Sequence, residues 1–179
     1  VDREYGGVFT CYNNSGDELV STDKYTWSQG RFLWLWSKIV SMMRLGLLSG
    51  DETPYLEQLE RTASFIEKHA FLESGSCAFL LNREGDKKEP EPGSGYDTSI
   101  FADCFVVLGL AEYAGVAGDR QRLETARTLY DHIRHRLDSG DVRSDPYPVP
   151  AGYRTHSVPM IRSEEHTSDL QSQGTISYA

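Results

Sequence analysis

The stretch from Lys24 to Lys38 holds the residues with the clearest chemical potential, because all three tryptophans of the chain lie within it. In a helix, Trp27, Arg31, Trp34 and Lys38 would fall on one face. A cation between indole rings suits a sugar, since an indole packs on the C–H side of a pyranose and a guanidinium donates hydrogen bonds to its oxygens. The alternative is a tryptophan-rich core helix whose arginine extends to solvent, and spacing alone favours that alternative.

Histidines offer one further candidate for acid/base chemistry. His132 and His135 lie among arginines on an amphipathic segment, where a solvated basic face is favoured over a metal site. His156 lies in a loop that leads into a covered segment, where it could face the interior of the fold. We therefore take His156 as the catalytic candidate within this chain.

Asp97 and Asp103 flank the start of a covered helix, and a carboxylate pair could serve glycoside hydrolysis. Asp97 is more simply a helix N-cap, whereas Asp103 is either paired inside the fold or exposed to its interior, and these two interpretations stay equal. The sequence has no Gly-x-Ser-x-Gly, Walker or Gly-x-Gly-x-x-Gly motif and no Cys-x-x-Cys spacing. It predicts no metal, no cofactor and no complete catalytic set.

Composition limits the classes of molecule that this protein is expected to bind. The net charge is -9 over 179 residues with no Lys/Arg block, which argues against nucleic acid. No apolar run reaches the roughly 18 residues of a membrane span, so no membrane is expected. Three widely spaced cysteines favour a reducing compartment, and we expect a cytoplasmic protein. The chain opens at Val1 without an initiator methionine, so its lack of a signal peptide carries little weight.

The patterning predicts a repeat that would position these residues. Residues 2–22 read as a hairpin, 25–48 as a helix covered on most sides, and 54–72 as a half-exposed helix. The same order recurs in residues 77–86, 99–116 and 119–137, after roughly 70 residues. Covered helices inside and amphipathic helices outside predict an all-α barrel or toroid, with a four-helix bundle as the rival.

The sequence predicts two regions. Residues 1–161 read as part of one barrel domain. Residues 162–179 closely resemble a translated sequencing-adapter oligonucleotide, so we leave this tail out of the reasoning on fold and function.

Three motifs occur in the order and approximate spacing of one enzyme family: Lys24-Tyr25-x-Trp27-x-Gln29-Gly30-Arg31-x-x-Trp34, Ser99-Ile100-Phe101-Ala102-Asp103-Cys104-Phe105 and Val158-Pro159-Met160. Through them, and through its Glu4-Tyr5-Gly6-Gly7 opening, the chain resembles the N-terminal half of the N-acylglucosamine 2-epimerase family. The resemblance looks closest to the N-acylglucosamine branch rather than to the cellobiose epimerase or mannose isomerase branches. The Trp-x-Gln-Gly-Arg motif is the most specific of these matches.

The resemblance implies an (α/α)6 barrel and epimerisation at C2 of an open-chain sugar through an enediolate, interconverting N-acetylglucosamine and N-acetylmannosamine. It implies Arg31 as the partner of a substrate oxygen and Trp27 as a wall of the sugar site. The substrate-binding candidates that share these motifs are Lys24, Tyr25, Gln29 and Asp103.

The family's catalytic histidines lie in later helices, so we expect this polypeptide alone to be inactive. Nucleotide activation is a trait of some members, and a homodimer stays open. The alternatives are a mannose-type aldose–ketose isomerase and a non-catalytic sugar-binding or interaction scaffold.

Overall fold

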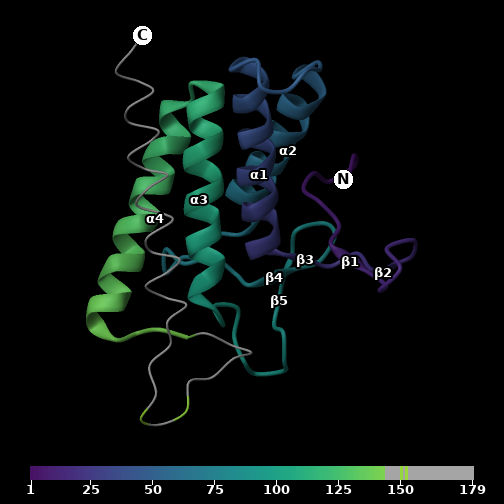
Figure 1. The fold of residues 1–179 in the computed structure, drawn as a ribbon. Helices are drawn as coiled ribbons and strands as arrows, with labels where there is room; N and C mark the ends of the chain where they lie inside the picture. The colour runs from purple at the N-terminus through teal and green to yellow at the C-terminus, as the bar shows by residue number, and fades with distance from the viewer. Residues whose placement is uncertain (144–149, 151, 153–179) are drawn as a thin grey trace.

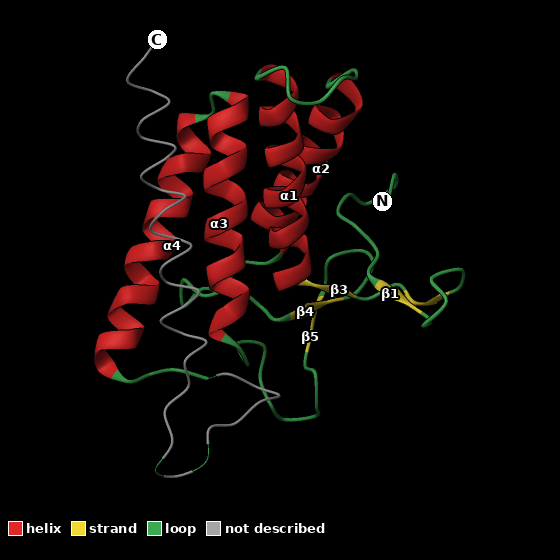
Figure 2. Cartoon of the chain, in the orientation of Figure 1, coloured by secondary structure: helices red, strands yellow, loops and turns green. Residues whose placement is uncertain are grey.

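The computed structural model of this protein describes residues 1–143, 150 and 152. Long helices stand side by side with short strands at one end of them (Figures 1 and 2). The helices are α1 (Thr26–Arg44), α2 (Thr53–His69), α3 (Ile100–Ala117) and α4 (Arg120–Ser139). The strands are β1 (Cys11–Tyr12), β2 (Leu19–Ser21), β3 (Lys24–Tyr25), β4 (Leu80–Leu81) and β5 (Lys87–Lys88). His156, the motif at 158–160 and the tail at 162–179 lie outside the described residues.

The strands tie the two halves of the repeat together. β1 and β2 form the first predicted hairpin, and β4 pairs antiparallel with β5, which begins directly after the second predicted hairpin segment at 77–86. β3 was not predicted as a strand. It pairs antiparallel with β4, with Lys24 opposite Leu81 and Tyr25 opposite Leu80. The segment that enters α1 is thereby fixed to the segment that precedes α3.

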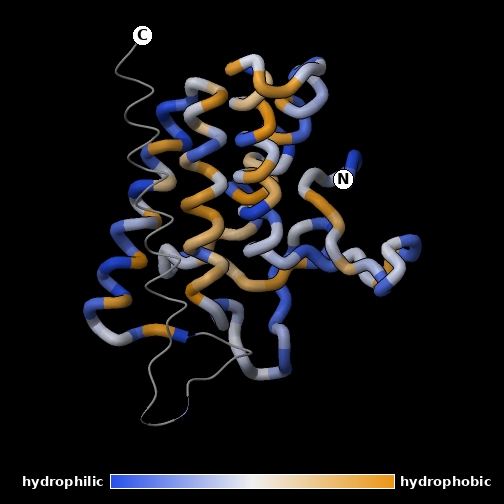
Figure 3. Tube along the Cα trace, in the orientation of Figure 1, coloured by the Kyte–Doolittle hydropathy of each residue, from blue (hydrophilic) through white to orange (hydrophobic). Residues whose placement is uncertain are grey.

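Helix α3 is the core helix of the described chain. It lies beside α1, while α2 and α4 flank this pair (Figure 1). Of its 18 residues, 13 are buried, which confirms the predicted covered helix, and its trace is largely apolar in Figure 3. It is also long and apolar enough to cross a membrane, but 72% of that window is buried inside the protein. Its apolar character is therefore explained by packing against α1 and α4.

Helix α1 is covered less completely than predicted. Six of its 19 residues are buried and face the neighbouring helices, and the exposed residues are Arg31, Leu35, Met42 and Arg44. Leu35 and Met42 are 51% and 40% exposed, and Arg31 is exposed beside them. These three residues share one helical stripe, which stays exposed in the described chain. In the described chain this open stripe of α1 holds the arginine beside two apolar side chains.

Helices α1 and α3 touch backbone to backbone at two glycines. A Cβ added to Gly109 would lie 2.5 Å from the carbonyl oxygen of Gly30, and one added to Gly30 would overlap the carbonyl group of Phe105. No side chain fits between the helices at this crossing. The glycine of the Gln-Gly-Arg motif therefore sets the distance between α1 and α3.

We predict that Gly30→Ala destabilises the chain by about 2–3 kcal/mol, because the methyl group must push two packed backbones apart. Gly115→Ala in α3 is the matched control, since a Cβ there meets nothing within 4 Å. The control should stabilise the helix by up to about 1 kcal/mol. Urea denaturation of both variants measures the difference. Similar effects of the two substitutions would contradict the backbone contact.

An arginine of α4 holds α2 in place. Arg122 donates hydrogen bonds of 2.6 and 2.7 Å to the two carboxylate oxygens of Glu60 and one of 3.0 Å to Glu67. The hydroxyl groups of Tyr113 and Ser64 also donate to Glu60. The hydrogen bonds from Arg122 hold the pKa of Glu60 at about 2, although partial burial acts in the opposite direction.

Glu60 gives the fold a defined acid sensitivity. Because its folded-state pKa lies below the ordinary value of 4.5, its stabilising contribution is complete above about pH 4.5 and is lost as pH falls towards 2. We predict that Glu60→Gln lowers the free energy of unfolding at neutral pH and flattens its fall across this window. Glu124→Gln, in an exposed pair with Arg127, is the control and should leave the slope unchanged. Denaturant titrations at several pH values test this, and an unchanged slope in Glu60→Gln would contradict it.

Candidate functional site

Arg31 lies on the open face of α1, near the end where the strands are. Its guanidinium carbon is 4.0 Å from the ring centroid of Phe105 and 5.4 Å from that of Trp27. Within the described residues, no carboxylate pairs with Arg31 and no acceptor takes its N–H groups. Aromatic rings flank the cation and leave its hydrogen-bond donors available for a ligand.

The platform beside Arg31 is an aromatic group made of Tyr25, Trp27, Phe79 and Phe105. The ring of Phe79 lies 5.1 Å from Trp27 and 5.4 Å from Tyr25, in edge contacts. The Tyr25 hydroxyl and the Trp27 indole N–H have no hydrogen-bond partner among the described residues. An apolar surface with polar edges next to a cation matches the mixed C–H and hydroxyl surface of a sugar.

Phe79 and Phe105 were not among the predicted site residues. Phe105 stands in the second motif, but sequence spacing does not reveal that this part of α3 lies against Arg31. Phe79 lies directly before β4, and its place beside Trp27 depends on the pairing of β3 with β4. Only the predicted repeat, which aligns the starts of the two covered helices, indicated that these residues and Arg31 lie close together.

The structure places Lys24 inside the protein, where its side chain does not reach the surface. Its side chain is 0% exposed, and its ammonium donates to Asp2 at 3.0 Å and to the carbonyl oxygens of Gly6 and Arg83 at 2.7 Å each. All three ammonium donors are used. Lys24 therefore does not fit the predicted substrate contact. It anchors the N-terminal segment to the loop after β4.

Asp2 and Lys24 form a buried pair. Burial alone would raise the pKa of Asp2, but hydrogen bonds from Arg83 and Lys24 hold that pKa well below its ordinary value. Burial lowers the pKa of Lys24, while its contact with Asp2 opposes the change. The carboxylate and the ammonium thus depend on each other.

Gln29 also has a structural position. It is fully buried, its amide oxygen accepts the N–H of Val8 at 2.8 Å, and its amide nitrogen donates to the Val8 carbonyl at 2.9 Å. A Cβ on Gly7 would lie 2.7 Å from the same amide oxygen, which explains the glycine there. Gln29 therefore does not fit direct sugar binding. It connects the Gly6-Gly7 opening to the start of α1.

Asp103 is paired inside the fold, which is one of the two interpretations that the sequence left open. It is fully buried, accepts the Cys77 N–H at 2.6 Å and pairs with Arg136 of α4 at 2.9 Å. The same guanidinium pairs with Asp97 at 3.1 Å and donates to the Ser76 hydroxyl at 3.0 Å. Burial raises the pKa of Asp103 to about 7, against the opposing hydrogen bond from Cys77 and the charge of Arg136. Direct sugar binding by Asp103 and glycoside hydrolysis by this carboxylate pair do not fit the geometry.

Of the predicted site residues, the structure brings together Tyr25, Trp27 and Arg31. It separates them from Lys24 and Gln29, which support the same segment from inside. Among the described residues, no group of three or more His, Cys, Asp or Glu side chains could hold a metal ion.

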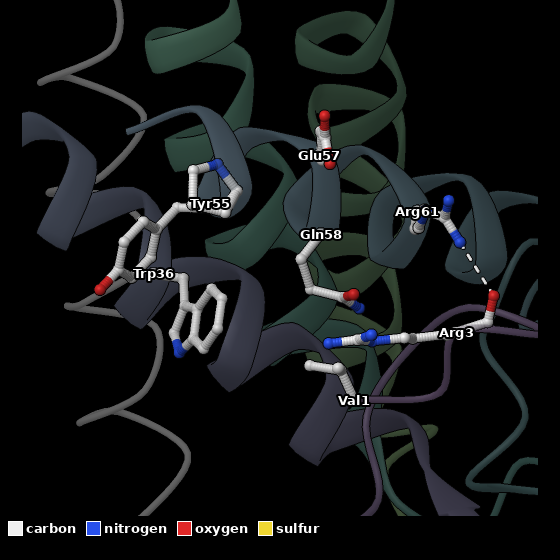
Figure 4. Close-up of a pocket in the computed structure, with 8 residues that line it drawn as sticks. Val1, Arg3, Trp36, Tyr55, Glu57, Gln58 and Arg61 are labelled. Atoms are coloured by element: carbon white, nitrogen blue, oxygen red, sulfur yellow. Dashed lines mark hydrogen bonds between the residues drawn. The ribbon is translucent and has the colours of Figure 1, made fainter. Parts of the chain in front are cut away.

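A groove of about 720 Å³ lies elsewhere, between the N-terminal segment and helices α1 and α2 (Figure 4). Trp36 and Tyr55 form one end of it, with ring centroids 5.0 Å apart, and Arg61 donates to the Arg3 carbonyl oxygen at 2.9 Å at the other. Trp36 is five residues after Arg31, which places it about 140° around the helix. The groove contains no predicted site residue and is separate from the Arg31 site.

Paired helices with short strands at one end of them define a mostly helical fold with small β-hairpins. Solved structures share this fold. A sugar epimerase from a ruminal bacterium has a TM-score of 0.60 at 23% identity, covering 75% of this chain and 32% of that one. The cellobiose 2-epimerase of Bacillus thermoamylovorans has a TM-score of 0.64 at 17% identity, covering 97% of this chain and 44% of that one. The cellobiose 2-epimerase of Spirochaeta thermophila has a TM-score of 0.63 at 18% identity, covering 98% of this chain and 43% of that one.

A sequence relative agrees with the fold. The chain is 26% identical over 140 residues to the cellobiose 2-epimerase of Bacteroides fragilis, and the match covers 77% of this chain. It spans 32% of the length of that relative. No family model matches the chain. The predicted resemblance to sugar epimerases is confirmed, with partial coverage of each relative.

Proposed function

We propose that this chain is the N-terminal part of a sugar 2-epimerase that interconverts N-acetylglucosamine and N-acetylmannosamine. The observation that carries the proposal is the exposed guanidinium of Arg31, flanked by Trp27 and Phe105 and without an acceptor for its N–H groups among the described residues. Such a group can bind a sugar oxygen while an aromatic ring supports the sugar's C–H face.

The chemistry assigns Arg31 a specific task. A base removes the proton at C2 of the open-chain sugar, and the electron pair of that C–H bond moves towards the carbonyl oxygen to give an enolate. The N–H groups of Arg31 stabilise the charge on this oxygen. An acid then returns a proton to C2 on the opposite face. Histidines suit both proton transfers, and the resemblance puts the main pair beyond this chain, with His156 as the candidate within it.

The open stripe of α1 supports the proposed barrel. Leu35 and Met42 are too apolar to favour contact with water, and they lie in line with Arg31. In a complete (α/α)6 barrel, later helices cover this stripe and α1 becomes part of the inner wall. The sugar then lies in the interior, where water is excluded and the guanidinium acts more strongly.

The remaining proposals follow from composition and resemblance. The partner is a small sugar, without a requirement for a metal, nucleic acid or membrane, and the compartment is the cytoplasm. Nucleotide activation, which is a trait of some family members, and a homodimer are further proposals to be tested.

The relative from Bacteroides fragilis favours a second candidate, the same reaction on a cellobiose-type disaccharide. To test both, the whole protein is incubated in D2O with N-acetylglucosamine, cellobiose or mannose and followed by NMR. Deuterium at C2 together with N-acetylmannosamine supports the proposal, and epimerised cellobiose supports the second candidate. A ketose from mannose indicates an isomerase, whereas no conversion of any sugar overturns the enzymatic proposals and favours a binding scaffold.

A further inference from the structure

Phe105 is a buried core residue whose ring lies against the exposed cation of the site. Its side chain is 6% exposed, and its centroid is 4.0 Å from the guanidinium carbon of Arg31. Trp27, the predicted sugar wall, is farther from the cation at 5.4 Å. The closest aromatic support of Arg31 therefore comes from α3 and not from its own helix.

The glycine crossing explains how Phe105 reaches this position. Gly30 directly precedes Arg31, and its Cα touches the backbone of Phe105 so closely that a Cβ could not fit. Gly109, one turn further along α3, meets Gly30 from the same side. Because the backbones of residues 30 and 105 are in contact, the side chains of Phe105 and Arg31 must be neighbours.

An aromatic partner and a carboxylate partner of Arg31 differ in whether they leave its N–H groups available to a ligand. A carboxylate partner would occupy the N–H groups of Arg31 and neutralise its charge. A ring face stabilises the guanidinium plane through cation–π contact and leaves the in-plane N–H groups available. Within the described residues Arg31 has only such ring contacts.

We propose that Phe105 is the positioning residue that fixes the guanidinium plane of Arg31, so that its N–H groups point at the substrate oxygen. The inference rests on the proposed function for its catalytic consequence, whereas the fixed plane itself is a property of this chain. Gly30 and Gly109 permit this contact, and Phe105 makes it.

The first experiment uses the chain itself. In a 15N-labelled sample, the Arg31 Nε–Hε NMR signal is identified by its loss in Arg31→Lys. The ring of Phe105 should shift this signal upfield, Phe105→Leu should abolish the shift, and Phe105→Tyr should retain it. Ile133→Val in α4 is the control for a small core loss away from the site, and it should leave the shift unchanged. An identical Arg31 signal in the wild type and Phe105→Leu overturns the inference.

The second experiment measures 2-epimerisation by the whole protein. Phe105→Leu should lower kcat roughly 10-fold with little change in KM. A misplaced guanidinium would stabilise the charged enolate oxygen less well, whereas its binding of the ground-state sugar would change little. Phe105→Tyr should restore most of the rate, and Ile133→Val should be close to wild type. Equal losses in Phe105→Leu and Ile133→Val contradict the positioning role. If the wild type does not epimerise sugars, the proposed function fails, while the NMR result still decides whether Phe105 holds Arg31.

Discussion

Replacing Arg31 by lysine in the whole protein should lower kcat for 2-epimerisation by about 100-fold to 1000-fold, the cost of losing a donor to a developing oxyanion. Lysine keeps the positive charge but lacks the planar fork, so it cannot lie along the Phe105 ring and present N–H groups in a fixed direction. Because the enolate oxygen carries more charge than the carbonyl oxygen, KM should change much less than kcat.

The control for this substitution is Arg134→Lys, on the exposed face of α4, which should leave both kinetic constants unchanged. Deuterium exchange at C2, followed by NMR, reports the proton transfer directly. If Arg31→Lys exchanged deuterium nearly as fast as the wild type, Arg31 would not be the partner of the reacting oxygen. If instead KM rose with kcat unchanged, Arg31 would bind the sugar uniformly without contributing to the chemical step.

The sequence predicted the helices well, because each carries its own periodic signal. α2 and α4 show clear amphipathic stripes, and Asp119 caps α4, because its carboxylate accepts a hydrogen bond from the Arg122 N–H. The nearly uniform apolarity of α3 predicted its burial. The same reasoning was only partly right for α1, because Leu35 and Met42 stay exposed in the described chain while the rest of its apolar residues are buried or half-buried.

The site was harder to predict, because a motif does not separate residues that bind from residues that support. Lys24, Gln29, Gly30 and Arg31 stand in one motif, yet only Arg31 is exposed. The partners that bury the others come from distant segments: Asp2 for Lys24, Val8 for Gln29 and Phe105 for Gly30. Such contacts depend on tertiary structure, so spacing alone could not assign these roles.

Removing Arg136, the cation that pairs with Asp103, should have the largest effect on stability. Arg136→Met removes the buried cation, which is 4% exposed, and leaves two carboxylates facing an apolar side chain. Breaking a buried pair in this way should cost about 3–5 kcal/mol. Arg134→Met on the same helix, in an exposed pair at 3.8 Å with Asp131, is the matched control and should cost about 1 kcal/mol or less. Urea denaturation of the two variants measures the difference.

The pH dependence separates loss of charge pairing from loss of packing. Without Arg136, the pKa of Asp103 in the folded protein should rise further above about 7. At pH values below this pKa, the buried carboxyl group would be neutral. A raised folded-state pKa means that stability falls as pH rises, so the deficit of Arg136→Met should be larger near about pH 8 than near about pH 5. Adding Asp103→Leu should remove this pH dependence and recover part of the stability, because an apolar pair then replaces a single buried charge. A deficit that is the same at both pH values would show that Arg136 contributes packing and not charge.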